Sequence, residues 1–251
     1  LGRVVRLGLV APHLSAGLSL TPRPDLLSII VPAHNEARVI ARLARSILDS
    51  NDVNFELIVV LDRCTDDTRA RLEAAGGGDP RLLIIENSDC PSDWAGKCNA
   101  ARVGAEAASS EWLLFTDADV QFDPNALQAA LCLAVEGNLS LLSVYTTLTA
   151  THWWEKVVQP VAAIALARQF PADKVNHPTR PRSFANGQFM LFSRAMYDSI
   201  GGHQAVKDDL LEDIAFARFV HRDGGRIAVV ASDGLVVTSM YPSLGRLMAG
   251  W

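Results

Sequence analysis

Two aspartates, Asp117 and Asp119, stand one residue apart directly after the apolar run Trp112–Thr116. In an extended chain the side chains at positions i and i+2 point the same way, so both carboxylates can aim at one point. Converging carboxylates repel one another unless a cation lies between them, and their hard oxygens suit Mg²⁺ or Mn²⁺. Such an ion usually takes further ligands from the phosphates of a substrate. The pair therefore predicts a metal-dependent enzyme with a phosphorylated, nucleotide-linked substrate.

The same pattern has a simpler interpretation. Asp-x-Asp after a strand is also ordinary turn and cap chemistry, and Asp123-Pro124 has the form of a helix cap followed by a first-turn proline. Short motifs of this kind carry a high risk of false positives. The aspartate pair gains weight only if other polar residues gather at the same edge of the fold.

The first half of the chain alternates continuous apolar runs with segments of helical spacing. Fully apolar strands separated by helices indicate a mostly parallel central sheet with helices on both faces, which is an α/β fold. We expect strands at residues 26–31, 55–61, 81–85 and 112–116, and helices at residues 36–48, 65–75, 97–107 and 124–135.

The second half is less regular, and we expect it to elaborate the same sheet for substrate binding. A largely apolar helix is expected at 153–169, where it could lie on a bilayer surface or in the core, since periodicity does not separate the two. The remaining expectations are strands at 140–145, 188–192 and 226–230, a helix at 210–221, and a polar loop at 171–181.

Composition narrows the class of protein. The chain has 251 residues, 49% of them hydrophobic and 20% charged, which suits one large globular domain. A net charge of -5 argues against a nucleic acid partner. The four cysteines form no CxxC pair, so we expect reduced thiols in a cytosolic setting. No uninterrupted apolar run reaches the roughly 18 residues of a spanning helix, but the chain starts and stops in mid-pattern and is expected to be a fragment.

Polar residues also follow the first two predicted strands. The run at 32–36 (PAHNE) and Asp62 could offer backbone groups and carboxylate oxygens to a nucleoside. The alternative is that Asn35 merely caps the next helix. Asp66 and Asp67 fall in the first turn of a predicted helix, where the helix dipole favours acids, and we interpret them as structural.

Further candidates lie at predicted helix and strand starts. Lys97 could meet a phosphate or order the metal-site loop, although a solvated lysine is the simpler interpretation. Glu212 and Asp213 open a helix, where carboxylates are usually caps, but an Asp213 that projects into a pocket could deprotonate an acceptor hydroxyl. Gly187 would let the backbone approach a ligand closely. The chain has neither a GxGxxG nor a GxxxxGK[ST] loop, which argues against a dinucleotide dehydrogenase and a P-loop NTPase.

Taken together, the order of these motifs resembles the family-2 glycosyltransferases, which have the GT-A fold. The likeness covers residues 26–251, and Trp153-Trp154-Glu155 and Gly201-Gly202 look similar to the membrane-associated branch of hopene-associated glycosyltransferases. The motifs that carry the likeness are PAHNE at 32–36, Asp62, Gly96-Lys97, Asp117-Ala118-Asp119, Asn186-Gly187-Gln188, Glu212-Asp213 and an aromatic–basic tail.

The resemblance implies an inverting hexosyltransferase that moves a sugar from a nucleotide-diphosphate sugar, by family habit a UDP-sugar, to a hydroxyl acceptor that could be a lipid. It implies a nucleotide-sugar half at 26–125, an acceptor half at 126–251 and an extension at 1–25. It also implies that the protein is located at the cytoplasmic side of a membrane. The residues implied are Pro32, Ala33, His34, Glu36, Asp62 and Lys97 for the nucleotide, Asp117 and Asp119 for the ribose and the diphosphate-bound Mn²⁺ or Mg²⁺, Asp213 with Glu212 for catalysis, and Gly187, Gln188, Arg246 and Trp251 on the acceptor side.

Three departures from the family pattern are visible. Arg63-Cys64 stands where the family usually has Gly-Ser, and Leu61-Asp62 stands where it usually has two acids. Processive members carry an Arg before the final Trp, whereas Gly250 precedes Trp251 here. We therefore expect no processive polymer synthesis.

Two rival functions remain from the residues themselves. A nucleotidyltransferase also uses an α/β sheet and a carboxylate-bound metal, but it normally has a glycine-rich, basic loop after the first strand, and PAHNE is neither. A non-catalytic binding module that kept the fold but lost the chemistry is the second rival. Turnover of a nucleotide sugar separates the enzyme from the module.

Overall fold

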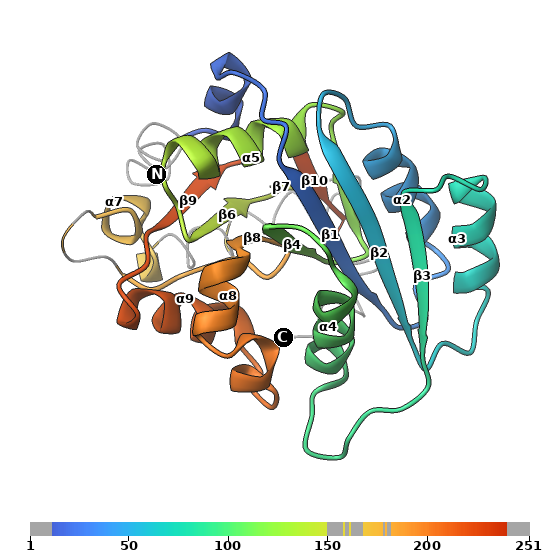
Figure 1. The fold of residues 1–251 in the computed structure, drawn as a ribbon. Coiled ribbons are helices and arrows are strands. Elements are labelled where there is room, and N and C mark those ends of the chain that lie inside the picture. Colours follow the sequence, from blue (N-terminus) through green and yellow to red (C-terminus); the bar gives the residue numbers. More distant parts are fainter. Residues whose placement is uncertain are drawn as a thin grey trace.

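The computed structural model describes residues 12–149, 158, 161, 168–177, 179 and 182–239. A seven-stranded sheet in the order β3-β2-β1-β4-β8-β6-β9 forms its centre (Figure 1). In that order the strands are β3 (Leu82–Asn87), β2 (Asn54–Asp62), β1 (Leu26–Ala33), β4 (Trp112–Thr116), β8 (Phe189–Ser193), β6 (Leu141–Tyr145) and β9 (Ile227–Ala231).

Six of these seven strands run in the same direction. Only β8 is antiparallel, to β4 on one side and to β6 on the other. Ile29, Ile30 and Val31 of β1 are all fully buried, so both faces of the strand are covered. This explains the continuous apolar sequence of the strand, because a parallel sheet has no solvated face. The predicted α/β class with a mostly parallel sheet is confirmed.

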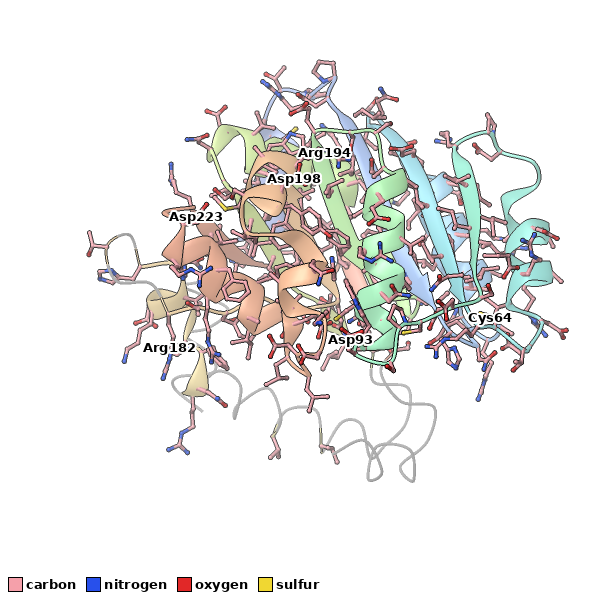
Figure 2. The ribbon with its side chains drawn as sticks, turned by 60° about the horizontal axis from the view of Figure 1, so that its bottom comes forward. Cys64, Asp93, Arg182, Arg194, Asp198 and Asp223 are labelled. Carbon is pink, nitrogen blue, oxygen red and sulfur yellow. The ribbon has the colours of Figure 1, made fainter. Side chains whose placement is uncertain are left out.

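Helices cover both faces of the sheet. On one face, Ile30 of β1 and Phe115 of β4 pack with α4 (Gly96–Ala107), α8 (Arg194–Ser199) and α9 (Glu212–Arg222). Figure 2 shows Arg194 and Asp198 of α8 in front of the sheet, beside α4.

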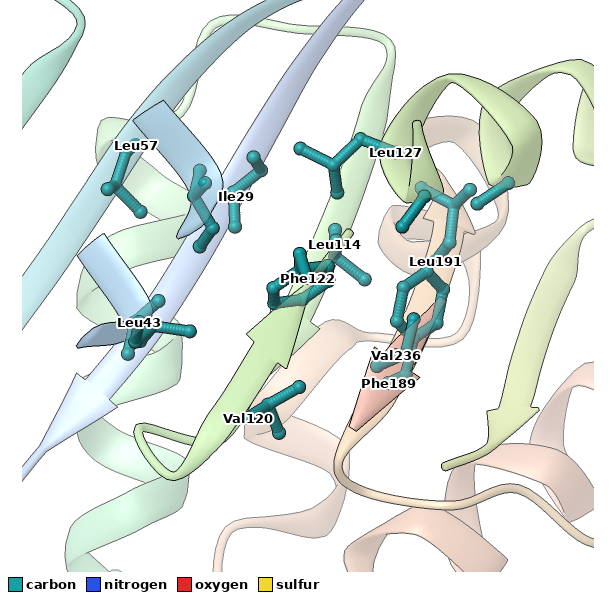
Figure 3. Packing of buried hydrophobic residues seen from close by; sticks show 14 of the residues in the cluster. Ile29, Leu43, Leu57, Leu114, Val120, Phe122, Leu127, Phe189, Leu191 and Val236 are labelled. Atoms are coloured by element: carbon teal, nitrogen blue, oxygen red, sulfur yellow. The ribbon is translucent and has the colours of Figure 1, made fainter. Parts of the chain in front are cut away.

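The opposite face carries the larger core. Leu27, Ile29 and Val31 of β1 pack there against three helices and β5, and Figure 3 shows part of this cluster, with Leu43 and Leu127 on the helices. The helices are α2 (Ile40–Leu48), α3 (Thr68–Gly76) and α5 (Ala126–Glu136).

A second, three-stranded sheet lies beside the main one. It consists of β5 (Val120–Phe122), β10 (Val236–Thr238) and β7 (Thr147–Leu148) in that order. β5 begins directly after Asp119 and pairs antiparallel with β10. Our sequence expectations did not include this sheet, because strands of two or three residues offer too little alternation to detect.

Several predicted boundaries are wrong. The helices expected from 36 and 65 begin at Ile40 and Thr68, because the preceding residues form turns. Asn35 caps neither helix: it has a left-handed φ of 56°, and its Oδ1 accepts from Thr65 N. The expected loop at 171–181 contains a helical turn, α7 (Ala172–Val175). Most of the expected helix at 153–169 lies outside the described residues.

The segment before β1 packs on the domain. It forms a 3₁₀ helix, η1 (Leu14–Ser19), in which Leu14 is fully buried. Gly17 lies so close to α5 that an added Cβ would be 2.1 Å from Ala129 O. A second 3₁₀ helix, η2 (Gly202–Val206), precedes α9. All four cysteines are free, and in the described part of the chain we find no helix with the length and apolarity to cross a bilayer.

Candidate active site

The strand order of the main sheet reverses at β1 and β4. From β1 the chain moves outward to β2 and β3, and it then returns to add β4 on the other side of β1. In open α/β sheets, ligands bind where the strand order reverses in this way. The turn after β1, with His34 and Glu36, and the turn after β4, with Asp117 and Asp119, therefore lie at the same edge of the sheet, where a ligand is expected.

Asp117 and Asp119 lie in a tight turn between β4 and β5, not in an extended continuation of β4. The side-chain alternation on which we expected their convergence therefore does not apply. The two carboxylates nevertheless interact. Burial, together with the charges of Asp117 and Glu36, raises the pKa of Asp119 to about 7. Asp119 Oδ1 is buried and has no hydrogen-bond partner within the described residues.

Lys97 links the two halves of the site. Its Nζ lies 2.9 Å from Asp117 Oδ1 and 2.9 Å from Glu212 Oε1. Burial alone would lower the pKa of Lys97, but the carboxylates of Asp117 and Glu212 raise it well above its usual value. The lysine is therefore charged and held between two acids, while its side chain remains 44% exposed to solvent.

Asp213 opens α9 next to Glu212 and contacts the backbone before β8. Its Oδ2 accepts a hydrogen bond from Gly187 N at 3.1 Å, and its Oδ1 accepts one from Ile214 N at 2.7 Å. Burial raises the pKa of Asp213, with a further rise from Glu212, while these hydrogen bonds oppose the shift. A Cβ added to Gly187 would lie 3.5 Å from Lys97 Nζ and 3.6 Å from Asp213 Oδ2. The structure thus brings these predicted residues together around one backbone position.

Gln188 follows Gly187, but its side chain contacts other residues than Lys97 and Asp213. Its Oε1 accepts hydrogen bonds from Thr146 Oγ1 at 2.5 Å and from Thr238 Oγ1 at 3.3 Å, the latter on β10. The side-chain oxygen of Gln188 is therefore occupied in joining the main sheet to the small one. Arg246 and Trp251, the other predicted acceptor-side residues, lie outside the described residues.

The residues predicted to hold a nucleoside lie at the ends of β1 and β2. Pro32 and Ala33 are the last residues of β1 and pair with Val60 and Leu61 of β2. His34 Nδ1 lies 2.6 Å from the carbonyl oxygen of Asp62, so Nδ1 must carry the proton. Figure 2 shows Cys64, which follows β2, and Asp93, which precedes α4, at this same end of the molecule.

Asp62 itself is not a free acceptor. It is 3% exposed. Arg63 donates to it through Nε at 3.2 Å and Nη2 at 2.6 Å, and Asn87 donates through Nδ2 at 2.9 Å. Reasoning from the sequence missed this cluster: the replacement of the usual glycine by Arg63 was visible, but the approach of Asn87 from β3 depends on strand pairing.

The charge balance of the site favours a bound cation. Burial raises the pKa of Glu36, as does the nearby charge of Asp117. The charge of Lys97 acts on four carboxylates, those of Asp117, Asp119, Glu212 and Asp213, and Glu36 adds a fifth carboxylate that interacts with Asp117 and Asp119.

The oxygen donors of Asp117 and Asp119 suit Mn²⁺ or Mg²⁺, and the unpartnered Asp119 Oδ1 leaves a ligand position open. No group of three or more acidic, histidine or cysteine side chains in the described ranges is arranged to hold an ion by itself. This fits an ion that is completed by water and substrate phosphates.

Comparison with known proteins concerns the family and the fold of the chain. The model of the family described as "Glycosyl transferase family 2" matches residues 28–201. The 4,4'-diaponeurosporenoate glycosyltransferases of Staphylococcus aureus strains MRSA252 and USA300 are 25% and 26% identical to the chain. In both cases the match covers 90% of this chain and 59% of the relative. The chain thus spans about three-fifths of these curated relatives.

Two solved structures show the fold. A mannosyltransferase from Pyrobaculum calidifontis, in complex with GDP-Man and Mn²⁺, matches with a TM-score of 0.69 at 17% identity, covering 98% of this chain and 67% of that one. A glucosyl-3-phosphoglycerate synthase from Mycobacterium tuberculosis, with Mn²⁺ and UDP, matches with a TM-score of 0.59 at 21% identity, covering 94% and 78%. The fold is therefore that of the GT-A glycosyltransferases.

Proposed function

We propose that this chain, which belongs to glycosyl transferase family 2, is the catalytic domain of a metal-dependent, inverting glycosyltransferase. Its donor would be a nucleoside-diphosphate sugar and its acceptor a hydroxyl group. The observation that carries the proposal is the buried oxygen of Asp119, which has no hydrogen-bond partner among the described residues and lies next to Asp117, where the strand order reverses. An excess of buried negative charge at a ligand-binding edge is unfavourable unless the site receives a cation.

Asp117 and Asp119 would hold the divalent ion, Mn²⁺ or Mg²⁺, together with the diphosphate of the donor. Such an ion stabilises the negative charge that grows on the diphosphate as the glycosidic bond breaks. Lys97 supports this arrangement from the protein side, because its ammonium group holds Asp117 in place at 2.9 Å. The Mn²⁺ in the two solved structures supports the choice of metal by fold analogy alone.

Asp213 would act as the general base. Its pKa is raised by burial, which makes its carboxylate a better proton acceptor than an exposed one. It lies on α9, which packs beside β9 and η2, whereas the residues proposed for the nucleoside lie at the ends of β1 and β2. A single base that removes the acceptor proton during direct attack at the anomeric carbon leads to inversion. Glu212 would keep Lys97 in position rather than take part in proton transfer.

We further propose that the acceptor is an apolar, membrane-associated molecule and that the enzyme binds it at the cytoplasmic face of the bilayer. Leu210 is 93% exposed and Leu211 is 63% exposed, and both directly precede Glu212 and Asp213. Adjacent exposed leucines are costly in water and suit contact with an apolar partner. The acceptor class in the name of the Staphylococcus aureus relatives, 4,4'-diaponeurosporenoate, supports an apolar molecule here.

The test uses the purified chain, Mn²⁺, a panel of nucleoside-diphosphate sugars and a long-chain alcohol in detergent. Release of nucleoside diphosphate measures turnover, and calorimetry measures donor binding. Asp213→Asn should retain donor binding and lose transfer by roughly 10²–10⁴-fold, the usual contribution of one general base. Asp117→Ala should lose Mn²⁺-dependent donor binding.

Asp209→Asn is the matched control, because Asp209 is exposed and precedes the same helix. It should behave like the wild type in both assays. Donor binding without turnover in the wild type would identify a binding module in place of an enzyme. Unchanged turnover in Asp213→Asn would refute the role of that residue.

A further inference from the structure

The carboxylate of Asp62 is fully engaged inside the protein. Its Oδ1 accepts hydrogen bonds from Arg63 Nε and Asn87 Nδ2, and its Oδ2 accepts one from Arg63 Nη2. The side chain of Asp62 is only 4% exposed, whereas that of Arg63 is 45% exposed. A ligand at this edge of the sheet therefore meets the guanidinium group of Arg63 first, and it can reach Asp62 only after Arg63 has moved.

The backbone and the neighbouring helix hold Arg63 in this position. Its φ is 48°, in the left-handed region that a non-glycine residue rarely adopts, and its N–H donates to Asn87 O at 2.9 Å. Gly96, the first residue of α4, leaves the space that the side chain needs. A Cβ there would be 2.5 Å from Arg63 Nη2 and 3.0 Å from Asp62 Oδ2. Backbone, carboxylate and glycine together therefore fix the guanidinium group over Asp62.

This position is where the base of the donor nucleotide would lie. The metal–diphosphate group belongs at Asp117 and Asp119 after β4, and Asp213 marks the side from which the acceptor attacks. The nucleoside must then extend the other way, over the ends of β1 and β2. His34 directly follows β1, and its ring is hydrogen-bonded to the carbonyl oxygen of Asp62. This residue lies on the expected path of the nucleoside.

We propose that Arg63, and not Asp62, contacts the base of the donor nucleotide and selects for hydrogen-bond acceptors on it; this inference rests on the glycosyltransferase function proposed above. A guanidinium group has only donors. Nη1 of Arg63 has no hydrogen-bond partner in the described part of the chain, so it can donate to a ligand. Asp62 and Asn87 are positioning residues, because they hold the fork of Arg63 and do not touch the base.

The chemical consequence concerns which edge of the base is read. A free carboxylate would require an N–H on the base, such as N3–H of uracil or N1–H of guanine. Arg63 instead requires carbonyl oxygens or ring nitrogens, such as O4 of uracil or the adjacent O6 and N7 of guanine, which arginine binds with both arms. Methylation of the base N–H separates the two cases, since it removes the donor and leaves the carbonyl oxygens.

The first experiment needs no variant of the protein. Calorimetry in Mn²⁺ compares UDP with N3-methyl-UDP and GDP with N1-methyl-GDP, using the pair whose parent binds more tightly. We expect the dissociation constant of the methylated compound to lie within about threefold of that of its parent, because no free carboxylate is available to accept a hydrogen bond from the base N–H. A loss of roughly tenfold or more, the value of a hydrogen bond to a charged group, overturns the proposal.

The second experiment uses Arg63→Met, with Arg69→Met as the matched control. Arg69 is an arginine of nearly the same side-chain exposure, 46%, that pairs with Glu73 and Glu86 and not with Asp62. Arg63→Met should weaken nucleoside diphosphate binding by about tenfold to a hundredfold, and Arg69→Met should not. If Asp62 contacts the base directly, Arg63→Met uncovers it, and the affinity then stays the same or rises, which overturns the proposal.

Two further measurements keep the result interpretable. Arg63→Lys retains the charge beside Asp62 without the planar fork; because it keeps the ion pair, we expect it to fold like the wild type and to bind the diphosphates more weakly than the wild type. Inorganic pyrophosphate with Mn²⁺ tests the metal–diphosphate site alone and should bind equally to the wild type and to Arg63→Met. Failure of the wild type to bind pyrophosphate contradicts the proposed function itself, whereas normal pyrophosphate binding with unchanged nucleotide affinity in both Arg63 variants contradicts only the role of Arg63.

Discussion

Lys97 Nζ and Glu212 Oε1 lie 2.9 Å apart, and this ion pair joins the two halves of the site. Lys97 is on the first turn of α4, between β3 and β4, whereas Glu212 opens α9, more than a hundred residues later. The same ammonium group also contacts Asp117. Asp117, a proposed metal ligand, and Glu212, the neighbour of the proposed base, thus share the charge of Lys97. A change at either carboxylate therefore alters the electrostatic environment of the other.

Replacement of Lys97 by Met should therefore affect catalysis through charge. The positive charge of Lys97 lowers the pKa values of Asp119 and Asp213, so its loss raises both. Each carboxylate must be ionised to bind metal or accept a proton. We expect kcat/KM to fall by roughly 10–100-fold, the effect of one to two pKa units near neutral pH. The acidic limb of the pH profile should move to higher pH.

Two variants separate charge from packing. Lys97→Arg keeps the charge and should retain the pH profile. Lys207→Met removes a lysine that pairs with Asp93 in a neighbouring loop, and it should change neither the rate nor the profile. A normal acidic limb in Lys97→Met would mean that Lys97 does not set the ionisation of the site.

The affinity for Mn²⁺ should depend on pH through Asp119. A proton and the metal compete for this carboxylate, whose pKa is raised to about 7. One competing proton with that pKa predicts a dissociation constant about tenfold lower at pH 8 than at pH 6. Calorimetry with Mn²⁺ and a fixed concentration of UDP across this range measures the effect.

Asp119→Asn is the direct check on that assignment, because an amide does not titrate in this range. Its weaker Mn²⁺ binding should show much less change between pH 6 and pH 8. If the variant keeps the tenfold dependence, the titrating group is another carboxylate of the cluster.

Part of this site could be predicted from the sequence and part could not. The aspartate pair after β4 and the acids that open α9 were identifiable, because each directly follows or begins a strong local signal. The contact between Lys97 and Glu212 was not, because it depends on how α4 and α9 pack on the sheet. Local patterns predict elements, whereas ion pairs between distant elements follow only from the tertiary structure.

The fold, too, could be predicted from the sequence only in part. The continuous apolar runs of β1, β2 and β4 predicted the parallel strands in the first half of the chain. Such sequences are typical of a sheet with helices packed on both faces. The turn at Asp117–Asp119 was wrongly expected to be extended, because β5 is only three residues long and its pairing with β10 joins segments more than a hundred residues apart. The ion pair of Asp62 with Arg63 lay hidden in a similar way, since Asn87 and Gly96 complete it from other elements.

Without metal, the stability of the protein should fall as pH rises through the pKa of Asp119. Its folded-state pKa of about 7 exceeds its ordinary value of 3.8, so the folded protein holds the proton more tightly than the unfolded chain does. This stabilisation is present at low pH and is lost between about pH 4 and pH 7. Asp119→Asn should therefore gain melting temperature relative to wild type at pH 8 in EDTA, and gain less at pH 5.

Comparison with the variant is needed because other groups titrate in the opposite direction. The pKa of Asp79, for example, is lowered to about 2 by its hydrogen bonds with Arg81. Asp209→Asn, which alters an exposed carboxylate, should show the same difference from wild type at both pH values. Addition of Mn²⁺ at pH 8 should restore the stability of wild type and leave Asp119→Asn nearly unchanged.

Gly187→Ala should impair the acceptor step while sparing the fold. The added methyl group would lie 3.5 Å from Lys97 Nζ, 3.6 Å from Asp213 Oδ2 and 3.7 Å from Glu212 Oε1, which are ordinary contact distances. The melting temperature should therefore change little. The methyl group would, however, occupy space next to the base through which an acceptor hydroxyl must approach, so we expect the KM for the acceptor to rise by roughly tenfold.

Donor binding supplies the control for this last variant. Neither Asp117 nor Asp119 supplies any of the three atoms nearest to the added methyl group, so the affinity for UDP and Mn²⁺ should stay close to that of wild type. The slow release of nucleoside diphosphate to water, measured without acceptor, should also persist, because water is small enough to pass the methyl group. Equal losses of donor affinity and acceptor KM would instead show that Gly187→Ala displaces Lys97, and the acceptor path would have to be placed elsewhere.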